Sequence, residues 1–395
     1  MSSTREAVIV SAVRTPIGRF LGALSSLSAT QLGALAVRAA LHRAQLPPDQ
    51  LDEVILGNVV SAGLGQAPAR QAAIRGGVPE SVPAMTINKV CGSGLKAVML
   101  AAQAIRAGDG DAFLAGGFES MSNAPYLLRQ ARTGYRLGHG ELLDANLLDG
   151  LWCAFTDQHM GSCAEFIAEK YGITREQQDK YALASHRKAV AAIQAGRFQA
   201  EIVPVEVAEK GGTRVISVDE PPRPETSMEA LSRLRPAFQE NGTVTAGNAP
   251  GLSDGAAALV VMEAEAARRR GIRPLARIVG YASAALEPRL IFAAPTQAIH
   301  RLLERTGTRL EDYDLLEINE AFAAQILANG KELGWDWERV NVNGGAVALG
   351  HPIGASGARI LTTLIYALRD RGQRRGLAAL CLGGGGAVAM AVEAL

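Results

Sequence analysis

The sequence has few cysteines and almost no excess charge of either sign. Its 395 residues include 40 basic and 39 acidic side chains, and no run of lysine or arginine marks a surface for nucleic acid or membrane lipid. The four cysteines form no CxxC pair, and so few in a long chain do not resemble a disulfide framework. We therefore expect four reduced thiols, no metal site, no nucleic-acid partner and no membrane partner.

Targeting and membrane-spanning patterns are lacking as well. The chain enters an apolar strand within seven residues of its start, without a basic or apolar leader, which favours a cytoplasmic protein. The apolar stretch 377–395 is interrupted by four glycines at 383–386 and has Glu393 near its end. These interruptions predict two buried strands joined by a glycine turn rather than a membrane span.

Apolar runs alternate with helical patterns at 29–44 and 95–107, as in a layered α/β fold, and the rhythm returns after Arg277. The two halves can be matched in order. TINKVCGSGLKAV before DAFLAGGFE parallels GGAVALGHPIGASGARI before GLAALCLGGGG, and GNVV at 57–60 corresponds to INEAF at 318–322. Three matches in order predict an internal duplication.

Between the two halves the apolar pattern fades, and the chain becomes polar with clustered prolines, as in DEPPRPETS. This stretch is too long for a linker, which predicts an inserted region. We expect a first half at 1–118 plus 247–272, an inserted loop domain at 119–246 and a second half at 273–395.

Cys91 follows the extended run TINKV and precedes a helix that we expect to begin near Ser93. The free N–H groups and dipole of a helix N-terminus favour a thiolate, and Gly92 and Gly94 leave room for a substrate carbonyl. The alternative is an inert buried cysteine.

His351 lies among glycines in NGGAVALGHPIGASG, in the segment of the second half that matches the Cys91 loop. This placement suits a base for the thiol, although a histidine that only stabilises a turn fits too. We expect His42, His186 and His300 to be solvated on helix surfaces.

Several segments together resemble the thiolase family, in order over essentially the whole chain: NKVCGSGLKAV, GGFESMSNAPY, DQHMGSCAE, LRPAF, TAGNAPGLSDGAAA, EINEAFAAQ, NVNGGAVALGHPIGASGAR and CLGGGG. The resemblance implies the thiolase fold, an α/β fold with two βαβαβαββ halves in five α-β-α-β-α layers and an inserted loop domain. It also implies a homo-oligomer, either a dimer or a tetramer.

The same resemblance implies a role for each matching residue. Cys91 is similar to the nucleophile that accepts the acyl group, and His351 to the base that activates it. Cys381 is similar to the second thiol, which moves the α-proton of the attacking acetyl group. Asn319 resembles the residue whose bound water forms one oxyanion hole with His351 Nε2, and the N–H groups of Cys91 and Gly383 would form the other.

The implied activity is a ping-pong Claisen condensation of two acetyl-CoA to acetoacetyl-CoA and free CoA, together with the reverse thiolysis. No cofactor beyond these coenzyme A thioester substrates is implied. A degradative thiolase that cleaves longer 3-ketoacyl-CoA in fatty acid metabolism is the alternative. Asn319 and Cys381 argue against a ketoacyl synthase, and retention of both thiols, His351 and Asn319 argues against a protein that only binds coenzyme A.

Coenzyme A contacts are implied on the loop domain. Two segments depart from the family pattern: Pro250 stands where many members have serine, and Ile291 with Phe292 occupies a segment that is usually rich in glycine. We expect Arg223 beside the adenine nucleotide, and the following residues along the pantetheine and acyl path: Leu151, His159, Met160, Ala237, Phe238, Ala246, Ala249 and Phe322.

Overall fold

The computed structural model of the chain describes residues 5–395. Residues 1–4 lie outside the described residues. They include the start of the predicted first half and of the segment that was expected to lack a leader. Within 5–395, every helix is too short or too polar to span a bilayer.

Two successive parts of the chain fold with the same order of elements. Each runs strand, helix, strand, helix, strand, helix, strand, strand, except that the third strand of the second half is reduced to an isolated bridge between Leu316 and Val340. The predicted duplication is therefore seen in the structure. The first half contains β1 (Ala7–Arg14), α1 (Ala29–Ala44), β3 (Glu53–Gly57), α2 (Pro68–Arg75), β4 (Ala84–Ile87), α3 (Ser93–Ala107), β5 (Ala112–Ser120) and β12 (Ser253–Glu263). The second contains β13 (Ala276–Ala285), α8 (Ala294–Thr306), β14 (Leu315–Ile318), α9 (Ala323–Leu333), α11 (Ile353–Asp370), β15 (Arg375–Leu382) and β16 (Gly386–Ala394).

The strands follow one hydrogen-bonded path, β14-β15-β16-β13-β1-β12-β5-β3-β4, and β2 (Gly18–Arg19) pairs with β12. The two halves join where β1 meets β13, through only two residue pairs, Val8 with Arg277 and Ile9 with Ala276. Each half therefore keeps its own sheet. The apolar stretch at the end of the sequence forms the antiparallel strands β15 and β16 with a glycine turn between them, as predicted.

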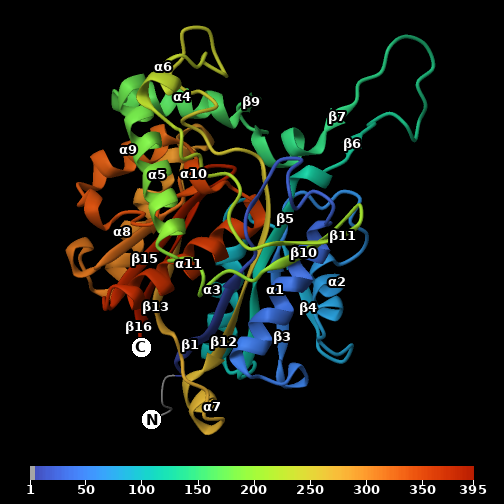
Figure 1. Cartoon of the computed structure of the whole chain (residues 1–395), viewed down its shortest axis with the longest axis vertical. Helices are drawn as coiled ribbons and strands as arrows, with labels where there is room; N and C mark the ends of the chain where they lie inside the picture. Colours follow the sequence, from blue (N-terminus) through green and yellow to red (C-terminus); the bar gives the residue numbers. More distant parts are fainter. Residues whose placement is uncertain (1–4) are drawn as a thin grey trace.

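The helices and sheets stack in five layers. α3 and α11 lie in the middle, and their apolar faces share one core with strands of both sheets. α1 and α2 cover the outer face of the first sheet, and α8 covers the outer face of the second. Figure 1 shows the two halves side by side, the first in blue and the second in orange and red. The predicted α-β-α-β-α arrangement is confirmed.

The two central helices touch backbone to backbone near their N-termini. A Cβ atom on Gly94 of α3 would lie 2.8 Å from the backbone nitrogen of Ala358, and one on Gly357 of α11 would lie 2.4 Å from that of Leu95. These glycines occupy matching places in the two halves, so the same small residue on each helix permits the close approach. The contact brings together the loops that precede the helices.

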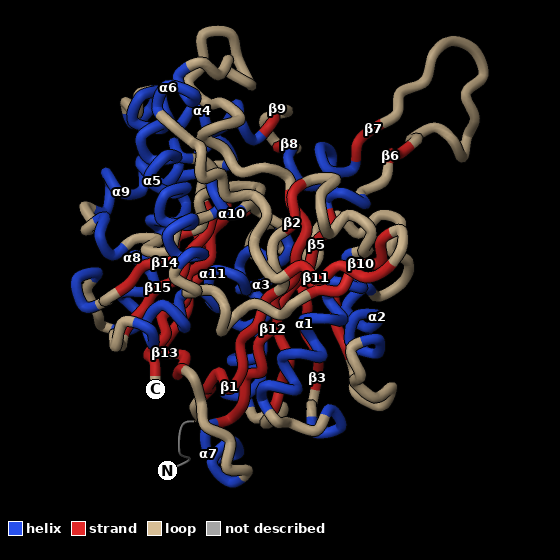
Figure 2. Tube along the Cα trace, in the orientation of Figure 1, coloured by secondary structure: helices blue, strands red, loops and turns tan. Residues whose placement is uncertain are grey.

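An inserted region between β5 and β12 covers one end of the two halves, drawn in green and yellow in Figure 1. Figure 2 shows part of it, the loop between β6 and β7, extending away from the body of the protein. The region contains η2 (Met121–Asn123), β6 (Tyr126–Leu127), β7 (Leu143–Asp144), the π-helix η3 (Asn146–Leu151), β8 (Trp152–Cys153), β9 (Gln158–His159), α4 (Met160–Tyr171), α5 (Arg175–Gln194), β10 (Val205–Glu209), β11 (Gly212–Ile216) and α6 (Met228–Ser232). The remaining short helices are η1 (Pro48–Gln50), α7 (Ala264–Arg269), η4 (Pro288–Ala293), η5 (Leu310–Asp312), η6 (Trp337–Arg339) and α10 (Ala346–Leu349).

A buried arginine ties this inserted region to the first half. Arg14, at the end of β1, donates from Nε to Glu201 (2.6 Å) and from both terminal nitrogens to Asp219 (2.6 and 2.8 Å). All three side chains are buried. In a buried ion pair of this kind, each charge is stabilised by the opposite charge beside it. The loss of one partner therefore leaves an unpaired charge in the core.

Replacement of Arg14 by alanine is expected to lower the free energy of unfolding by about 3–5 kcal/mol, because Glu201 and Asp219 then stay buried without their cation. Urea denaturation monitored by circular dichroism measures the change. Arg268→Ala is the matched control, since Arg268 pairs with Glu265 on the exposed surface of α7, where an ion pair contributes little. Equal denaturation midpoints for the two variants would contradict the expectation.

Candidate active site

Cys91 lies on the short connection between β4 and α3, as predicted from its place between a strand and a helix. Val90 before it has φ +47°, a left-handed conformation that turns the chain sharply. Ser93, the first residue of α3, donates its hydroxyl to the carbonyl of Val90 (2.6 Å) and holds this turn. Gly92 leaves room for Leu382, because a Cβ atom at Gly92 would lie 2.5 Å from the end of the Leu382 side chain. The end of β15 thus packs directly on the Cys91 loop.

The environment of Cys91 does not favour the thiolate, contrary to our expectation from the helix N-terminus. Burial raises the pKa of the thiol to about 12, although the N–H groups of Cys91 and Gly383 pull it in the other direction. Burial outweighs the helix N-terminus because desolvation penalises the charged form. The sulfur is therefore a neutral thiol at rest, and it needs a base beside it.

His351 lies immediately before α11, on the loop that matches the Cys91 loop. Its Nδ1 is 2.6 Å from the hydroxyl oxygen of Ser356, which donates its own hydrogen to the carbonyl of Pro352 (2.9 Å). Since that hydrogen is committed, the proton of the ring lies on Nδ1, and Nε2 keeps a free lone pair. Burial, and then the charge of Arg359, lowers the pKa of His351 to about 3. The ring is a neutral base.

Asn319 follows β14 directly and brings its amide to the histidine. Its Nδ2 lies 3.4 Å from Nε2 of His351, and both side chains are buried. Its Oδ1 is also buried and has no hydrogen-bond partner within residues 5–395. A buried acceptor without a partner is costly, so this oxygen is suited to a hydrogen bond from a water or a substrate group.

Cys381 ends β15 just before the glycine turn, where Gly384 and Gly385 adopt left-handed backbone conformations with φ +83° and +84°. The thiol is buried. Its pKa lies well above the ordinary value because of burial and then the nearby Cys91. The conjugate thiolate is consequently a strong base.

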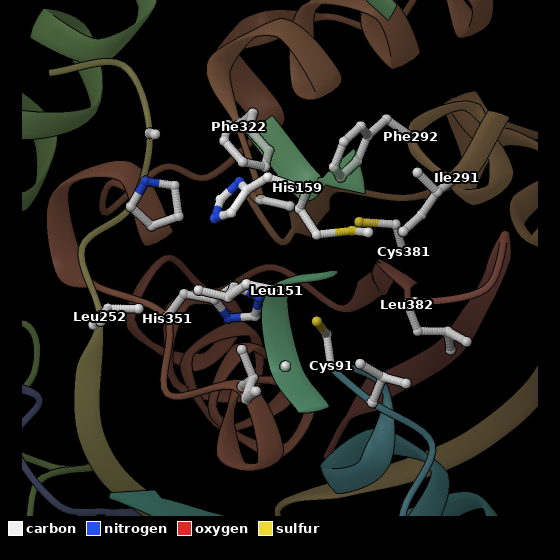
Figure 3. Close-up of a pocket in the computed structure, with 18 of the residues that line it drawn as sticks. Cys91, Leu151, His159, Leu252, Ile291, Phe292, Phe322, His351, Cys381 and Leu382 are labelled. Atoms are coloured by element: carbon white, nitrogen blue, oxygen red, sulfur yellow. The ribbon is translucent and has the colours of Figure 1, made fainter. Parts of the chain in front are cut away.

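The structure brings Cys91, His351, Cys381 and Gly383 to the wall of one cavity of about 300 Å³. Asn319 joins them through His351. Figure 3 shows the imidazole of His351 and the sulfur atoms of Cys91 and Cys381 facing the same space. The cavity therefore combines two protonated thiols with a neutral imidazole, an arrangement suited to covalent transfer and to proton abstraction.

Sequence reasoning missed Glu119, a buried carboxylate at the end of β5. It accepts hydrogen bonds from the side chain of Asn58 (2.8 Å) and from the backbone N–H groups of Val59 (3.1 Å), Val60 (3.2 Å) and Gly354 (2.9 Å). Burial raises its pKa to about 7 in spite of these bonds. Because Gly354 belongs to α11, Glu119 fixes the position of the His351 loop relative to the first half. The signal in the sequence was one acidic residue at the end of an apolar strand.

The predicted coenzyme A contacts fall mostly on two adjoining cavities. Leu151, His159, Met160, Phe238 and Phe322 line the cavity with the thiols, and Arg223 and Ala246 line a second one. Both cavities share the walls Ala249, Gly251 and Leu252, so they adjoin between Cys91 and Arg223.

One expectation near this path was wrong, and one predicted contact lies outside the linings of both cavities. Ala237 lines neither cavity, and its backbone N–H donates instead to the carbonyl of Val244 (2.9 Å). His186 is buried rather than solvated, and its Nδ1 accepts the backbone N–H of Arg223 (3.2 Å). The polar pattern of α5 concealed this burial, because the inserted segment that carries Arg223 covers the helix. Burial and then Arg223 lower the pKa of His186 to about 4, so the ring does not add charge to the path.

The part of the cavity beside Cys381 is apolar and closely filled. Ile291 and Phe292 of η4 line it, and the ring of Phe292 packs edge-on against that of Phe322 with 5.2 Å between centroids. His159 stacks on Phe238 at 4.6 Å and caps the first turn of α4 by accepting the N–H of Gly161. The two residues that depart from the glycine-rich pattern thus narrow the space available to an acyl chain.

Comparisons with known proteins agree with this site and fold. Family models described as thiolase, N-terminal domain, and thiolase, C-terminal domain, match residues 7–265 and 272–394. The chain is 58% identical to an acetyl-CoA acetyltransferase of Escherichia coli (strain K12), over 99% of this chain and all of that protein, and 55% identical to one of Pseudomonas aeruginosa, over 98% of each. The crystal structure of the Bacillus anthracis acetyl-CoA acetyltransferase superposes with a TM-score of 0.98 at 46% identity over the whole of both chains. The protein is therefore an acyltransferase enzyme that belongs to the thiolase family.

Proposed function

We propose that the protein is an acetyl-CoA C-acetyltransferase, which joins two acetyl-CoA to give acetoacetyl-CoA and CoA and also catalyses the reverse thiolysis. The observation that carries this proposal is the meeting of the half-buried Cys91 thiol, the buried Cys381 thiol and one neutral histidine at a single apolar cavity. A transferase that only moved an acyl group would need one thiol, whereas carbon–carbon bond formation needs a second base. The names of the similar proteins support the same activity.

In the first half-reaction, Cys91 Sγ attacks the thioester carbonyl of acetyl-CoA while Nε2 of His351 takes the thiol proton. Because the proton moves to His351 while the sulfur attacks, no free Cys91 thiolate has to form, and burial disfavours such a thiolate. The backbone N–H groups of Cys91 and Gly383 are suited to hold the negative oxygen of the tetrahedral intermediate. The CoA sulfur then leaves and takes the proton from His351, so Cys91 carries the acetyl group.

In the second half-reaction, the Cys381 thiol passes its proton to Nε2 of His351, and the resulting thiolate removes an α-proton from a second acetyl-CoA. Such a proton is weakly acidic, so a thiolate with a raised pKa is an appropriate base. The N–H now carried by Nε2 of His351, and a water bound to the amide of Asn319, hold the enolate oxygen. The carbanion attacks the acetyl group on Cys91, the Cys91 sulfur leaves and takes the proton from His351, and acetoacetyl-CoA forms. The reaction uses coenzyme A thioesters and needs no further cofactor.

Coenzyme A extends from the thiols along the joined cavities, with its nucleotide beside Arg223. Leu151, His159 and Phe238 contact the pantetheine, because they line the stretch between the thiols and the shared walls. Ala246 and Ala249 continue the path, while Pro250 lines the cavity without a hydroxyl group. Ala237, which precedes Phe238 in the chain, remains a predicted contact of the pantetheine.

The chain length of the acyl group is the point on which a degradative thiolase would differ. Met160, Ile291, Phe292 and Phe322 enclose the cavity beside Cys381, which favours a short acyl group. The test is thiolysis of acetoacetyl-CoA, 3-ketohexanoyl-CoA and 3-ketooctanoyl-CoA. We expect kcat/KM to fall at least about tenfold from the first substrate to the second, since each added methylene must displace packed side chains. Equal or rising values with length would contradict the short-chain assignment.

Replacement of Phe292 by glycine is expected to open the acyl end of the cavity. Removal of the ring leaves Phe322 without its edge-on neighbour and frees space for added methylenes. The ratio of kcat/KM for 3-ketohexanoyl-CoA to that for acetoacetyl-CoA should rise about tenfold. Phe166→Ala is the matched control, because Phe166 packs in the same apolar cluster but does not line the cavity. An unchanged ratio in Phe292→Gly would remove this residue from the determinants of chain length.

We also propose a homo-oligomer, either a dimer or a tetramer, located in the cytoplasm and active in fatty acid metabolism. Two features support self-association. β4 is an edge strand with the half-buried Ile87. The loop between β6 and β7 carries the exposed side chains of Leu128, Tyr135 and Leu137. Exposed apolar side chains of this kind mark contact surfaces. Sedimentation velocity tests the oligomer.

We also propose a division of the chain into three parts. Residues 119–246 form the inserted loop domain, and the two halves are 1–118 plus 247–272 and 273–395.

A further inference from the structure

Two wall segments from different parts of the chain meet at the acyl end of the cavity. Ile291 and Phe292 belong to η4, whereas Ala321 and Phe322 lie on the connection between β14 and α9. The rings of Phe292 and Phe322 pack edge-on across the boundary between the two segments. The space left for an acyl chain therefore depends on how far apart these segments are held.

Three hydrogen bonds in series join the two wall segments. The backbone N–H of Ala321 donates to Oε1 of Gln325 (3.0 Å), and Nε2 of Gln325 donates to Oδ1 of Asn329 (2.5 Å). Nδ2 of Asn329 then donates to the backbone carbonyl of Phe292 (2.8 Å). Gln325 and Asn329 lie one turn apart on α9, and both are fully buried. This amide pair thus connects the backbone of one segment to the backbone of the other.

The direction of these hydrogen bonds is fixed at both ends. A backbone N–H can only donate, so it needs the oxygen of the first amide, and a backbone carbonyl can only accept, so it needs the nitrogen of the second. Neither amide can rotate without leaving a buried polar group without its partner, which is costly. The amide pair is consequently a rigid spacer rather than an adaptable contact.

The amide pair acts on the acyl group only indirectly, because neither side chain lines the cavity. Ala328, which lies beside Asn329 on α9, packs in the same apolar cluster as Phe292 and Phe322. Two amides in such surroundings are costly unless their polar groups have partners. Their partners here are the backbones of the two wall segments, so the cost of burying the amides is offset while the segments stay in place.

We propose that Gln325 and Asn329 are positioning residues that set the longest acyl chain the enzyme accepts, by holding η4 against the start of α9. The proposal rests on the proposed short-chain thiolase activity and assigns part of its specificity to residues outside the cavity lining. When the amide of Asn329 is removed, the carbonyl of Phe292 loses this donor and space opens next to η4. η4 then moves back and leaves room for added methylene groups.

Asn329→Ala tests the spacing directly. The quantity to measure is the ratio of kcat/KM for 3-ketohexanoyl-CoA to that for acetoacetyl-CoA, since a general loss of folded enzyme lowers both values equally. We expect this ratio to rise at least about threefold above that of the parent. An unchanged ratio in folded Asn329→Ala would overturn the proposal.

Gln178→Ala is the matched control. Gln178 is also a buried amide, but it lies on α5 and donates to the hydroxyl of Thr243 (2.9 Å) instead of to a wall segment. Its replacement should leave the ratio within about 1.5-fold of the parent value, because the acyl wall keeps its spacer. A rise equal to that of Asn329→Ala would mean that the loss of any buried amide relaxes the specificity, and would contradict the assigned role.

Gln325→Met tests the other member of the amide pair and carries the test if Asn329→Ala does not fold. Methionine keeps the length of the side chain and removes both hydrogen bonds of Gln325, so the ratio should rise about twofold or more. Circular dichroism and thermal melting show which variants are folded. A lower melting temperature together with the parent's ratio would mean that the amide pair only stabilises α9, which would overturn the proposal.

The double variant Asn329→Ala/Phe292→Gly shows whether the amide pair acts through Phe292. If it does, the spacer has no ring left to position, and the double variant should keep the ratio of Phe292→Gly within about 1.5-fold. Independent effects would multiply instead and raise the ratio about threefold or more above that of Phe292→Gly. Such multiplication would contradict an action through this residue.

The same two substrates separate this inference from the function on which it rests. Equal kcat/KM values in the parent would contradict the short-chain assignment and, with it, any limit set by the amide pair. A parent that prefers acetoacetyl-CoA, with variants that keep its ratio, would contradict the role of the amide pair alone. We expect a parent that prefers acetoacetyl-CoA and a weaker preference in both Asn329→Ala and Gln325→Met.

Discussion

Replacement of Cys91 by alanine should lower both condensation and thiolysis by at least about 10⁴-fold, because no other sulfur can take its place as the acyl acceptor. The backbone donors at Cys91 and Gly383 stay in position, so substrate binding should change far less than turnover. Initial rates with acetoacetyl-CoA and CoA measure the loss, and equilibrium binding of CoA separates it from a loss of affinity.

Cys163→Ala is the control for this variant. It also removes a buried thiol, but one that does not line the cavity, and under reducing conditions its turnover should stay near that of the parent. If Cys91→Ala kept more than about one hundredth of the parent rate, the acyl group would have to travel on another residue.

Replacement of Cys381 by alanine should separate the two half-reactions. Exchange of the acetyl group between acetyl-CoA and isotope-labelled CoA needs only Cys91 and His351, so we expect it to stay within about tenfold of the parent. Condensation needs the base that removes the α-proton, and it should fall about 10²–10⁴-fold. The ratio of the two rates is the quantity to report, since a general loss of folded enzyme lowers both equally.

A proportional loss of exchange and condensation in Cys381→Ala would mean that the second thiol has a structural role. Parent-like condensation would be a stronger contradiction, since it would leave the α-proton to a different base.

The duplication was the most informative feature of the sequence. It predicted that the Cys91 loop and the His351 loop would meet, and the crossing of α3 and α11 at Gly94 and Gly357 is the physical reason that they do. The strand that ends at the glycine turn was likewise predicted correctly from its apolar pattern, whereas Asn319 and Cys381 were assigned to the site through the resemblance to the thiolase family. Strands that are buried on both faces form continuous apolar runs in the sequence, and these runs made the strands recognisable.

What the sequence could not provide depends on burial and on contacts between distant segments. Cys91 was expected to be a thiolate because its local neighbours favour one, yet desolvation by the second half raises its pKa. Glu119 accepts hydrogen bonds from residues on both halves, which no local pattern reveals. His186 was predicted to be exposed from the polarity of its helix, but the inserted region covers it.

The measurement that tests the account most directly is a trapping experiment on the Cys381→Ala enzyme. The variant is incubated with acetyl-CoA, quenched with acid and digested, and the acetylated peptide is identified by mass spectrometry. The account predicts close to one acetyl group per active site, on Cys91, without formation of acetoacetyl-CoA. An acetyl group on another residue, or an unmodified Cys91 after release of CoA, would contradict it.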